Sequence, residues 1–567
     1  MQLSTDTSPP ASAPATDGRL PIVVGVTGHR HLRPVDLPRY RAQVMDLFDQ
    51  LRQRYPTTPL RVISALAAGA DRVVAQVALE RGYEFVVPLP LEPRDYERDF
   101  PDSVDEFRAL LQRVSPEQVF VWPRAAAKND SQWCESREER DRQYREVGAF
   151  VAQQSHILLA IWDGVTDDGS AGTAGVVALK LGKSGARHAI AKSALDPEDS
   201  GPVYHVHAVR SGDPADASPP AQWLFPHDND AALFHTVCSR LDRYNAEATH
   251  ERIRARLPAA AASLLPGTDA TASGDRVLAT AFACADSLAV HYRRITQRVL
   301  RLTLLLAGLL ALIFEVYSEV LPLRIMPLAY LMCFALLALV LLWHGRLDAQ
   351  GRYLDYRALA EGLRVQFYWR LAGLTDNASA SYLRKQLDEL RWIREALRAT
   401  GAVPPPAAAE PELALKCWIS DQSTYYVARA RVLEQKSLLL ERWSRLFLIM
   451  GLAATFGLVV FWNALGELAT LHHWTVLIMG IAPVGAALWE AYGERSGVRT
   501  QANQYARFAS IFHRAELFFA KLELEPPTPA RRHGELVLLR ELGREALIEN
   551  ADWVRLLRDR PIALPKG

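Results

Sequence analysis

The sequence predicts an α/β domain with a parallel sheet, followed by an all-α membrane region with four transmembrane helices and long cytoplasmic helices. Three observations lead to this prediction. Apolar strands alternate with helices as far as about residue 210, small-residue turns follow three of these strands, and long uncharged segments occur only after residue 300. Alternating strands and helices indicate parallel strands joined by right-handed crossovers.

The composition limits the classes of function. The chain has 567 residues, enough for several domains, and its 65 Lys and Arg balance 64 Asp and Glu. This balance argues against a polycation that coats nucleic acid, so we expect no nucleic-acid partner. The five cysteines stand singly, which predicts free thiols in a reducing compartment and no metal site. Residues 1–19 lack the apolar core of a signal peptide and are expected to form a disordered cytoplasmic leader.

The first strand is expected at residues 22–26, an unbroken apolar run. It ends in the turn Thr27-Gly28-His29-Arg30 and is followed by a helix at 37–55. Backbone N–H groups at such a junction favour anions, because a helix N-terminus carries partial positive charge. The turn therefore indicates a phosphate-binding position, although a single turn of this kind is also consistent with a structural role.

Two further strands end in similar loops. A strand at 61–64 leads into the small-residue turn 67–71, where Asp71 is a candidate helix N-cap. A buried strand at 156–162 ends at Asp163-Gly164, before the loop 166–175. The other expected elements are strands at 84–87 and 203–209 and helices at 71–81, 103–114, 137–154, 176–181 and 233–244.

In a doubly wound sheet these three loops gather at one edge, where ligands bind. Together they favour a nucleotide or phosphate pocket. Arg30 and Arg72 are candidate partners for phosphate, with a solvated surface position as the alternative. Asp163 is a candidate for a ribose hydroxyl, or it caps the end of its strand.

The segments GVTGHR, SALAAGADR, DRQYREVGAFVAQQSH, LLAIWDG and GSAGTAG, in this order over about residues 20–210, resemble the SLOG family. This family is a Rossmann-like group related to DprA and to the LOG cytokinin-activating hydrolases. The resemblance implies a nucleotide-derived ligand of ADP-ribose or cyclic-nucleotide type and no cofactor. The ligand-binding residues expected on this basis are Gly25, Thr27, Gly28, His29, Arg30, Ser64, Gly69, Ala70, Asp71, Arg72, Asp163, Gly164, Gly172 and Thr173.

One position departs from the enzymatic members of the group. LOG enzymes resemble a G-G-x-G-T-x-x-E pattern, whose Glu helps to cleave an N-glycosidic bond. In this chain Val176 stands where that Glu would fall, and a valine cannot act as a general acid or base. The resemblance therefore implies binding without a catalytic residue. A membrane-anchored nucleotide or nucleoside hydrolase of LOG type is the alternative.

Turn-rich and small-residue stretches bound this domain. Residues 211–227 and 257–274 are expected to form loops or hinges, and a plain tether is an equal alternative. We place the ligand-binding domain at 20–250 and a linker at 251–275.

Three later segments, 325–343, 446–465 and 470–489, contain no Asp, Glu, Lys or Arg. At a rise of about 1.5 Å per residue, each spans the roughly 30 Å hydrocarbon core of a bilayer. A fourth segment, 302–317, is also predicted to span the membrane. It lies just before 325–343, in the same way that 446–465 lies just before 470–489. The chain is thus expected to form two hairpins in a lipid bilayer.

Basic residues set the expected orientation. Four arginines precede the first hairpin, and only Arg324 lies between its two helices. Three basic residues precede the second hairpin, whose turn has no Lys or Arg. Positive residues remain on the cytoplasmic side, so both chain ends are expected in the cytoplasm.

The flanks of the two hairpins repeat. Segments 285–301 and 418–436 precede them, and predicted helices at 350–374 and 499–522 follow. Tyr356 and Ala360 align with Tyr505 and Ala509, positions best explained by helix packing. With the pattern Asp421-Gln422-x-x-Tyr425-Tyr426 and the terminal segment 544–561, the arrangement resembles the SLATT family of two-helix membrane modules. The modules are placed at 276–400 and 416–567, with a Pro/Ala linker at 401–415.

The two resemblances together imply a pore-forming or membrane-disrupting effector of the bacterial inner membrane, acting in anti-phage defence and controlled by the nucleotide-derived ligand. We expect a homo-oligomer, because four sparse helices do not enclose a channel alone. Glu315 is the candidate pore residue, since charges at membrane depth often mark ion paths. The alternatives are an exposed interfacial glutamate at this position and, for the whole protein, a passive membrane scaffold.

Overall fold

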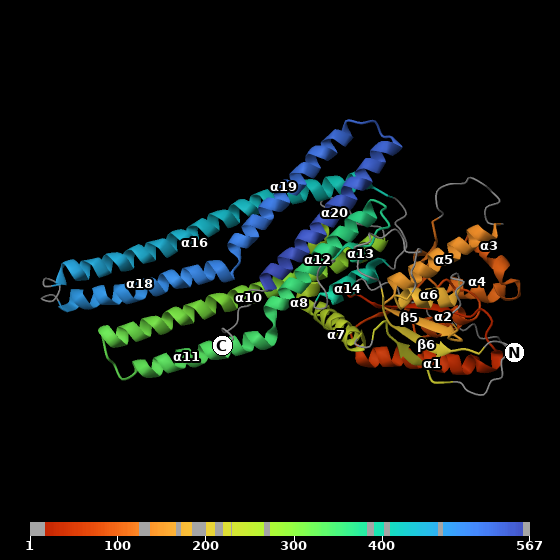
Figure 1. The fold of residues 1–567 in the computed structure, drawn as a ribbon, viewed down its shortest axis with the longest axis horizontal. Helices are drawn as coiled ribbons and strands as arrows, with labels where there is room; N and C mark the ends of the chain where they lie inside the picture. Colours follow the sequence, from red (N-terminus) through yellow and green to blue (C-terminus); the bar gives the residue numbers. More distant parts are fainter. Residues whose placement is uncertain are drawn as a thin grey trace. The chain divides into compact units, whose positions relative to one another are not determined.

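The structure is a computed structural model that describes residues 17–123, 136–165, 172–183, 200–209, 219–227, 230–265, 273–382, 390–401, 409–462 and 469–558. The chain forms two compact units, each assembled from separate stretches of sequence (Figure 1). Unit 1 contains Met1–Ser287, Leu359–Ala414 and Gly543–Ile548, and unit 2 contains Leu288–Ala358, Leu415–Leu542 and Glu549–Gly567.

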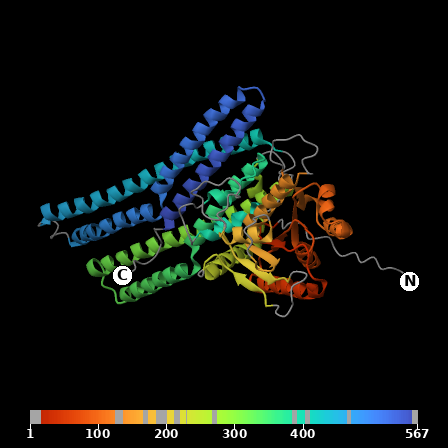
Figure 2. The ribbon, with the colours of Figure 1, turned by 45° about the vertical axis from the view of Figure 1, so that its right-hand side comes forward.

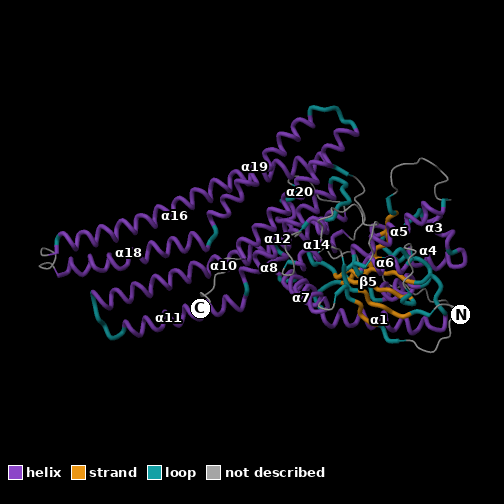
Figure 3. Tube along the Cα trace, viewed as in Figure 1, coloured by secondary structure: helices purple, strands orange, loops and turns teal. Residues whose placement is uncertain are grey.

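The described part of unit 1 contains one seven-stranded sheet, drawn in orange in Figure 3, with the order β4-β3-β2-β1-β5-β6-β7. All neighbouring strands are parallel except β6 and β7. The expected parallel α/β domain is therefore confirmed. The strands are β1 Ile22–Gly28, β2 Leu60–Ile63, β3 Glu84–Leu89, β4 Val119–Val121, β5 Ile157–Trp162, β6 Val203–His207 and β7 Gln222–Leu224.

Helices cover both faces of the sheet, which explains the unbroken apolar strands. Every residue of β3 and β5 is buried. The crossover helices agree with the sequence expectations to within a few residues at each end. They are α1 Leu37–Arg54, α2 Ala70–Glu80, α4 Val104–Gln112, α5 Arg137–Gln154, α6 Thr173–Lys180 and α7 Asp230–Ala248.

Short elements account for most differences from the sequence expectations. The three-residue strand β4 and the four-residue helix α3 (Pro93–Tyr96) are too short to carry a periodic signal. Part of the expected loop 211–227 is the antiparallel edge strand β7, and part of the expected linker 257–274 is α9 (Leu257–Ala262). Residues 211–218 and 266–272 of these stretches, and residues 1–16 of the leader, lie outside the described residues.

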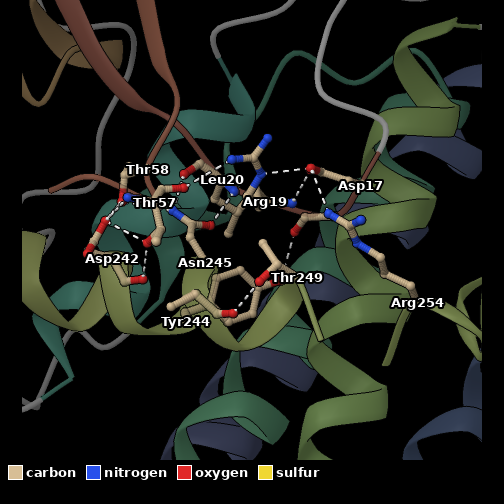
Figure 4. A network of polar contacts seen from close by, with 12 residues as sticks. Asp17, Arg19, Leu20, Thr57, Thr58, Asp242, Tyr244, Asn245, Thr249 and Arg254 are labelled. Carbon is tan, nitrogen blue, oxygen red and sulfur yellow. Dashed lines mark hydrogen bonds and ion pairs between the residues drawn. The ribbon is translucent and has the colours of Figure 1, made fainter. Parts of the chain in front are cut away.

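Polar side chains of α7 hold the entry to β1 (Figure 4). The buried Asn245 amide accepts a hydrogen bond from the Leu20 N–H and donates one to the Leu20 carbonyl, both at 2.8 Å. The Asp242 carboxylate accepts hydrogen bonds from the Thr57 N–H at 3.0 Å and the Thr58 hydroxyl at 2.7 Å. These contacts satisfy buried backbone groups just before β1 and β2.

Helix α14 (Arg391–Gly401) packs at the amino edge of the same sheet. His156, just before β5, accepts a hydrogen bond from the Val23 N–H at 2.8 Å, and its other ring nitrogen bonds the Glu395 carbonyl at 2.8 Å. Arg61 of β2 donates to the Ala399 carbonyl at 2.9 Å. The sheet domain thus includes residues far beyond 250 in the sequence, where its end was predicted.

Unit 2 contains the long apolar helices. Among the residues that the structure describes, four helices are long and apolar enough to cross a membrane, which supports the four predicted spans. The helices of this region are α10 Ser273–Glu319, α11 Met326–Leu347, α16 Asp421–Val460 and α18 Ala469–Arg495, followed by α19 Val498–Glu523 and α20 Pro529–Arg558. Large apolar side chains on these helices are exposed, as expected for surfaces that contact lipid; Leu305 is 70% exposed and Leu452 is 72% exposed.

Each pair of long helices forms a hairpin, as both Figure 1 and Figure 2 show. Leu306 and Leu310 of α10 pack against Cys333 of α11. In the second hairpin, Gly451 of α16 faces Ala482 and Pro483 of α18. Residues 463–468 of the predicted third span and its turn lie outside the described residues.

The repeated tyrosines make similar packing contacts in both modules. Tyr356 of α12 (Ala349–Leu371) lies 5.8 Å from Tyr292 of α10, between ring centroids. Tyr505 of α19 lies 5.7 Å from Tyr426 of α16. In each module, therefore, a tyrosine after the hairpin packs against one that precedes it, as the helix-packing interpretation predicts. Residues 402–408 of the Pro/Ala linker are outside the described part, and residues 411–415 form α15 (Pro411–Leu415).

The carboxylate of Glu315, the candidate pore residue, lies against α18. A Cβ placed on Gly480 would lie 2.4 Å from one of its oxygens. Gly480 therefore provides the space that this carboxylate occupies between α10 and α18.

Candidate functional site

A cleft of about 410 Å³ lies at the carboxyl edge of the sheet in unit 1. It lies where β1 and β5 are neighbours, although three strands and their connections separate them in sequence. A crevice at such a reversal of strand order is the usual ligand position in open α/β sheets. The predicted residues that line it are Thr27, Gly28, His29, Arg30, Asp71, Asp163, Gly172 and Thr173.

Glycines allow the turns after β1 and β2 to pack together. Gly69 has a φ of +80°, and a Cβ there would lie 2.4 Å from the carbonyl oxygens of both His29 and Arg30. The Ala70 N–H donates to the His29 carbonyl at 3.1 Å. A Cβ on Gly28 would lie 2.4 Å from that of Ala70. Gly69 and Ala70 do not line the cleft, but they fix the backbone that does.

His29 and Asp163 connect the ends of β1 and β5. The Asp163 N–H donates to the His29 Nε2 at 3.0 Å, and the same nitrogen lies 3.5 Å from the Asp163 carboxylate. The Asp163 carboxylate accepts from the Val165 N–H at 3.1 Å. Asp163 therefore caps the end of its strand and also lies at the cleft surface, so its two predicted roles are compatible.

Asp71 is a buried carboxyl group that lines the cleft. One of its oxygens accepts hydrogen bonds from the Ser64 hydroxyl at 2.7 Å and the Ala67 N–H at 3.4 Å. Burial raises the pKa of Asp71 to about 6, and hydrogen bonds from Ser64 and Ala67 oppose this shift. Ser64 thus acts on the site through Asp71.

Arg30 is the exposed cation of the cleft. Its guanidinium carbon lies 5.3 Å from the centroid of the Tyr144 ring. No carboxylate lies within ion-pair distance of Arg30 among the residues that the structure describes. The Tyr144 hydroxyl donates instead to Asp99, which also accepts a hydrogen bond from Arg140. Arg30 therefore remains available to an anion.

The amino end of α6 forms another part of the cleft lining. Gly172, Thr173, Ala174 and Gly175 lie there at the start of the helix. Val176 follows, and one of its methyl carbons would lie 2.8 Å from a Cβ on Gly148 of α5. Val176 is thus an apolar packing residue. Residues 166–171 of the preceding loop lie outside the described residues.

The structure places several predicted residues outside the cleft lining. Arg72 is buried and donates hydrogen bonds to Glu106 at 2.8 Å and to the Ser103 carbonyl at 2.9 Å. Its guanidinium also stacks over Phe100 at 4.5 Å, so it supports the fold. The other predicted residues outside the lining are Gly25, Ser64, Gly69, Ala70 and Gly164.

The ligand-binding residues predicted from the sequence did not include any aromatic side chain of the cleft. Tyr96, Tyr144 and Trp162 all line it. Tyr144 belongs to the tyrosine-bearing helix of the SLOG resemblance, which was the available signal. Tyr96 lies on α3, a helix too short to be predicted, so no pattern placed it near the site.

The described residues contain no cluster of three or more His, Cys, Asp or Glu that could hold a metal ion. The cleft instead combines one open cation, a helix N-terminus, a titratable carboxyl and aromatic faces. No family model, curated protein or solved structure matches the chain.

Proposed function

We propose that this protein is a bacterial inner-membrane effector whose Rossmann-like, SLOG-like domain binds a nucleotide-derived ligand and controls four transmembrane helices. Arg30 is the observation that carries the proposal. It is an exposed guanidinium without a carboxylate partner among the described residues, in a cleft that the amino end of α6 also lines. The Arg30 guanidinium and the backbone N–H groups at the amino end of α6 both favour phosphate oxygens.

ADP-ribose is the ligand type that best fits the remaining groups. The cleft volume of about 410 Å³ is within the range of small-molecule sites. The ring of Tyr144 provides a face for a base, and the Asp163 carboxylate provides an acceptor for a ribose hydroxyl. The diphosphate would then lie between Arg30 and α6.

Control of the membrane helices requires that the ligand bind one of their arrangements more tightly than another. Helices α10, α12, α15 and α20 each contribute residues to both units, so they are covalent routes between the cleft domain and the apolar hairpins. Opening a pore further requires several copies of the chain, as symmetric oligomers provide.

Calorimetric titration of the full chain in detergent tests the ligand proposal. ADP-ribose, AMP and a cyclic dinucleotide are compared. We expect selective binding of one ligand, weakened about tenfold or more in Arg30→Ala, because a charge-assisted contact contributes about 1.5–3 kcal/mol. Arg108→Ala is the matched control, since exposed Arg108 pairs with Glu97 outside the cleft. No binding of any ligand, or equal weakening in both variants, would contradict the proposal.

One observation favours a hydrolase as the second candidate. Asp71 is a carboxyl group in the cleft with a pKa of about 6, suited to general acid–base work near neutral pH. Incubating the full chain with the bound ligand and separating the products by chromatography decides between the candidates. Release of a free base that is lost in Asp71→Asn would establish hydrolysis, whereas an unchanged ligand supports binding alone.

A further inference from the structure

Two cations from different hairpins meet at one hydroxyl group in unit 2. The Lys436 ammonium of α16 lies 3.5 Å from the hydroxyl oxygen of Tyr492 of α18, and 5.4 Å from the centroid of its ring. The Arg301 guanidinium of α10 lies near enough to the same hydroxyl to act on it electrostatically. The three side chains, here called the Arg301 cluster, come from three helices.

The positive charges of this cluster are not neutralised by the described residues. Neither Arg301 nor Lys436 has a carboxylate within ion-pair distance among them. The carboxylate of Glu441, one turn beyond Lys436 on α16, pairs with Arg445 at 3.5 Å and Arg499 at 3.6 Å. Two like charges that share one neutral acceptor repel each other, so an anion between them would stabilise the arrangement.

The cluster lies at headgroup depth if the hairpins cross a bilayer. Arg301 directly precedes the predicted span 302–317, and Tyr492 follows the end of 470–489 by three residues, or about 4.5 Å. Trp443 and Trp489 stack at 6.3 Å beside it, as expected for aromatic residues at a membrane interface. Lys436 reaches this level through its flexible stem.

The chemistry of the cluster fits a phosphate group. A guanidinium presents a fork of donors to phosphate oxygens, and an ammonium and a phenol add further donors. Arg301 is exposed, so a lipid can reach it from the side. The cytoplasmic leaflet supplies anionic phosphate headgroups at high local concentration.

We propose that the Arg301 cluster binds the phosphate headgroup of an anionic phospholipid, which thereby bridges the two hairpins. The proposal rests on the membrane insertion proposed above, and it does not depend on the nucleotide ligand. It differs from general attraction to an anionic surface because three particular side chains from both hairpins form one site.

Thermal unfolding of the full chain in neutral detergent micelles tests the proposal. The micelles contain phosphatidylglycerol, phosphatidylcholine, or no lipid with inorganic phosphate in the buffer. We expect phosphatidylglycerol alone to raise the melting temperature, by about 3 °C or more. The double variant Arg301→Gln/Lys436→Gln is expected to lose most of this rise while melting like the wild type without lipid.

Arg445→Gln is the matched control, because Arg445 lies at the same boundary but pairs with Glu441. It should retain the rise. An equal rise in phosphatidylcholine, an equal rise with inorganic phosphate, or an equal loss in Arg445→Gln would each overturn a specific lipid site. ADP-ribose titration of the same samples, and flotation with liposomes, separate this result from failure of the nucleotide or membrane proposals.

Discussion

Asp71 shows how a single buried residue sets a property of the whole cleft. The pKa of Asp71 is raised in the folded protein, because burial disfavours the charged carboxylate more than the hydrogen bonds from Ser64 and Ala67 stabilise it. In the unfolded chain the same group titrates near 3.8. The folded state therefore holds the proton more tightly between about pH 4 and pH 6, and stability falls as the pH rises through this window.

We predict that Asp71→Asn removes this penalty. A pKa difference of about two units corresponds to about 3 kcal/mol, so the variant should be more stable than the wild type by up to that amount at pH 7. At pH 4 the two should be similarly stable. Thermal unfolding of both proteins at pH 4, 5, 6 and 7 checks the prediction. A constant difference across this range would show that Asp71 does not titrate there.

The packing of helix α14 against the sheet depends on His156, whose ring must stay neutral to keep its two hydrogen bonds. Burial lowers the pKa of His156 to about 4, from 6.5 in the unfolded chain. The neutral ring accepts from Val23 and donates to the Glu395 carbonyl. Its contribution to stability is complete above pH 6.5 and is lost as the pH falls toward 4.

We predict that amide protection of α14 against hydrogen exchange decreases as the pH falls from 6.5 to 4, by up to about 3 kcal/mol after correction for the intrinsic exchange rate. His156→Gln keeps a donor and an acceptor but does not titrate, so its protection should vary much less. Exchange measured by mass spectrometry on both proteins provides the check. An equal pH dependence in the two proteins would contradict this role.

Gly480 leaves room for the Glu315 carboxylate between α10 and α18. A Cβ there would displace that carboxylate, which is the far end of a flexible side chain, so Gly480→Ala should destabilise the packed hairpins by no more than about 1 kcal/mol. Gly457 on α16 has nothing within 4 Å of its Cβ position. Gly457→Ala should therefore be neutral, or stabilising by up to about 1 kcal/mol. Unfolding in a graded mixture of denaturing and neutral detergent compares the variants, and equal effects would refute the Glu315–Gly480 contact.

For the whole molecule, the orientation in the membrane is the property to test. Arg324 is expected on the outer side, and the four described cysteines are free, with Cys238, Cys284 and Cys333 buried. A membrane-impermeable maleimide added to intact spheroplasts should therefore label Arg324→Cys and leave the wild type unlabelled. If the wild type alone were labelled, or if Arg324→Cys were labelled only after lysis, the expected orientation would be wrong.

The sequence predicted what local pattern controls. Apolar runs located β1 and β5, and glycine-bearing turns located the cleft. Uncharged segments located three of the four apolar helices, and the repeated order of the hairpins located the fourth. Arg72 was misleading, because its partners Glu106 and Ser103 lie more than 30 residues away and only the fold brings them together. Tyr96 was not predicted for the same reason, because only the fold brings it to the cleft. The domain was predicted to end near residue 250, since no local pattern marks α14 as part of the sheet domain.

The position of α14 has a consequence for synthesis of the protein. Domains fold as they leave the ribosome, from the amino terminus onward. Arg61 and His156 lie at an edge that α14 covers, and α14 ends at Gly401. This edge of the nascent sheet therefore stays uncovered until both helices of the first hairpin have been translated.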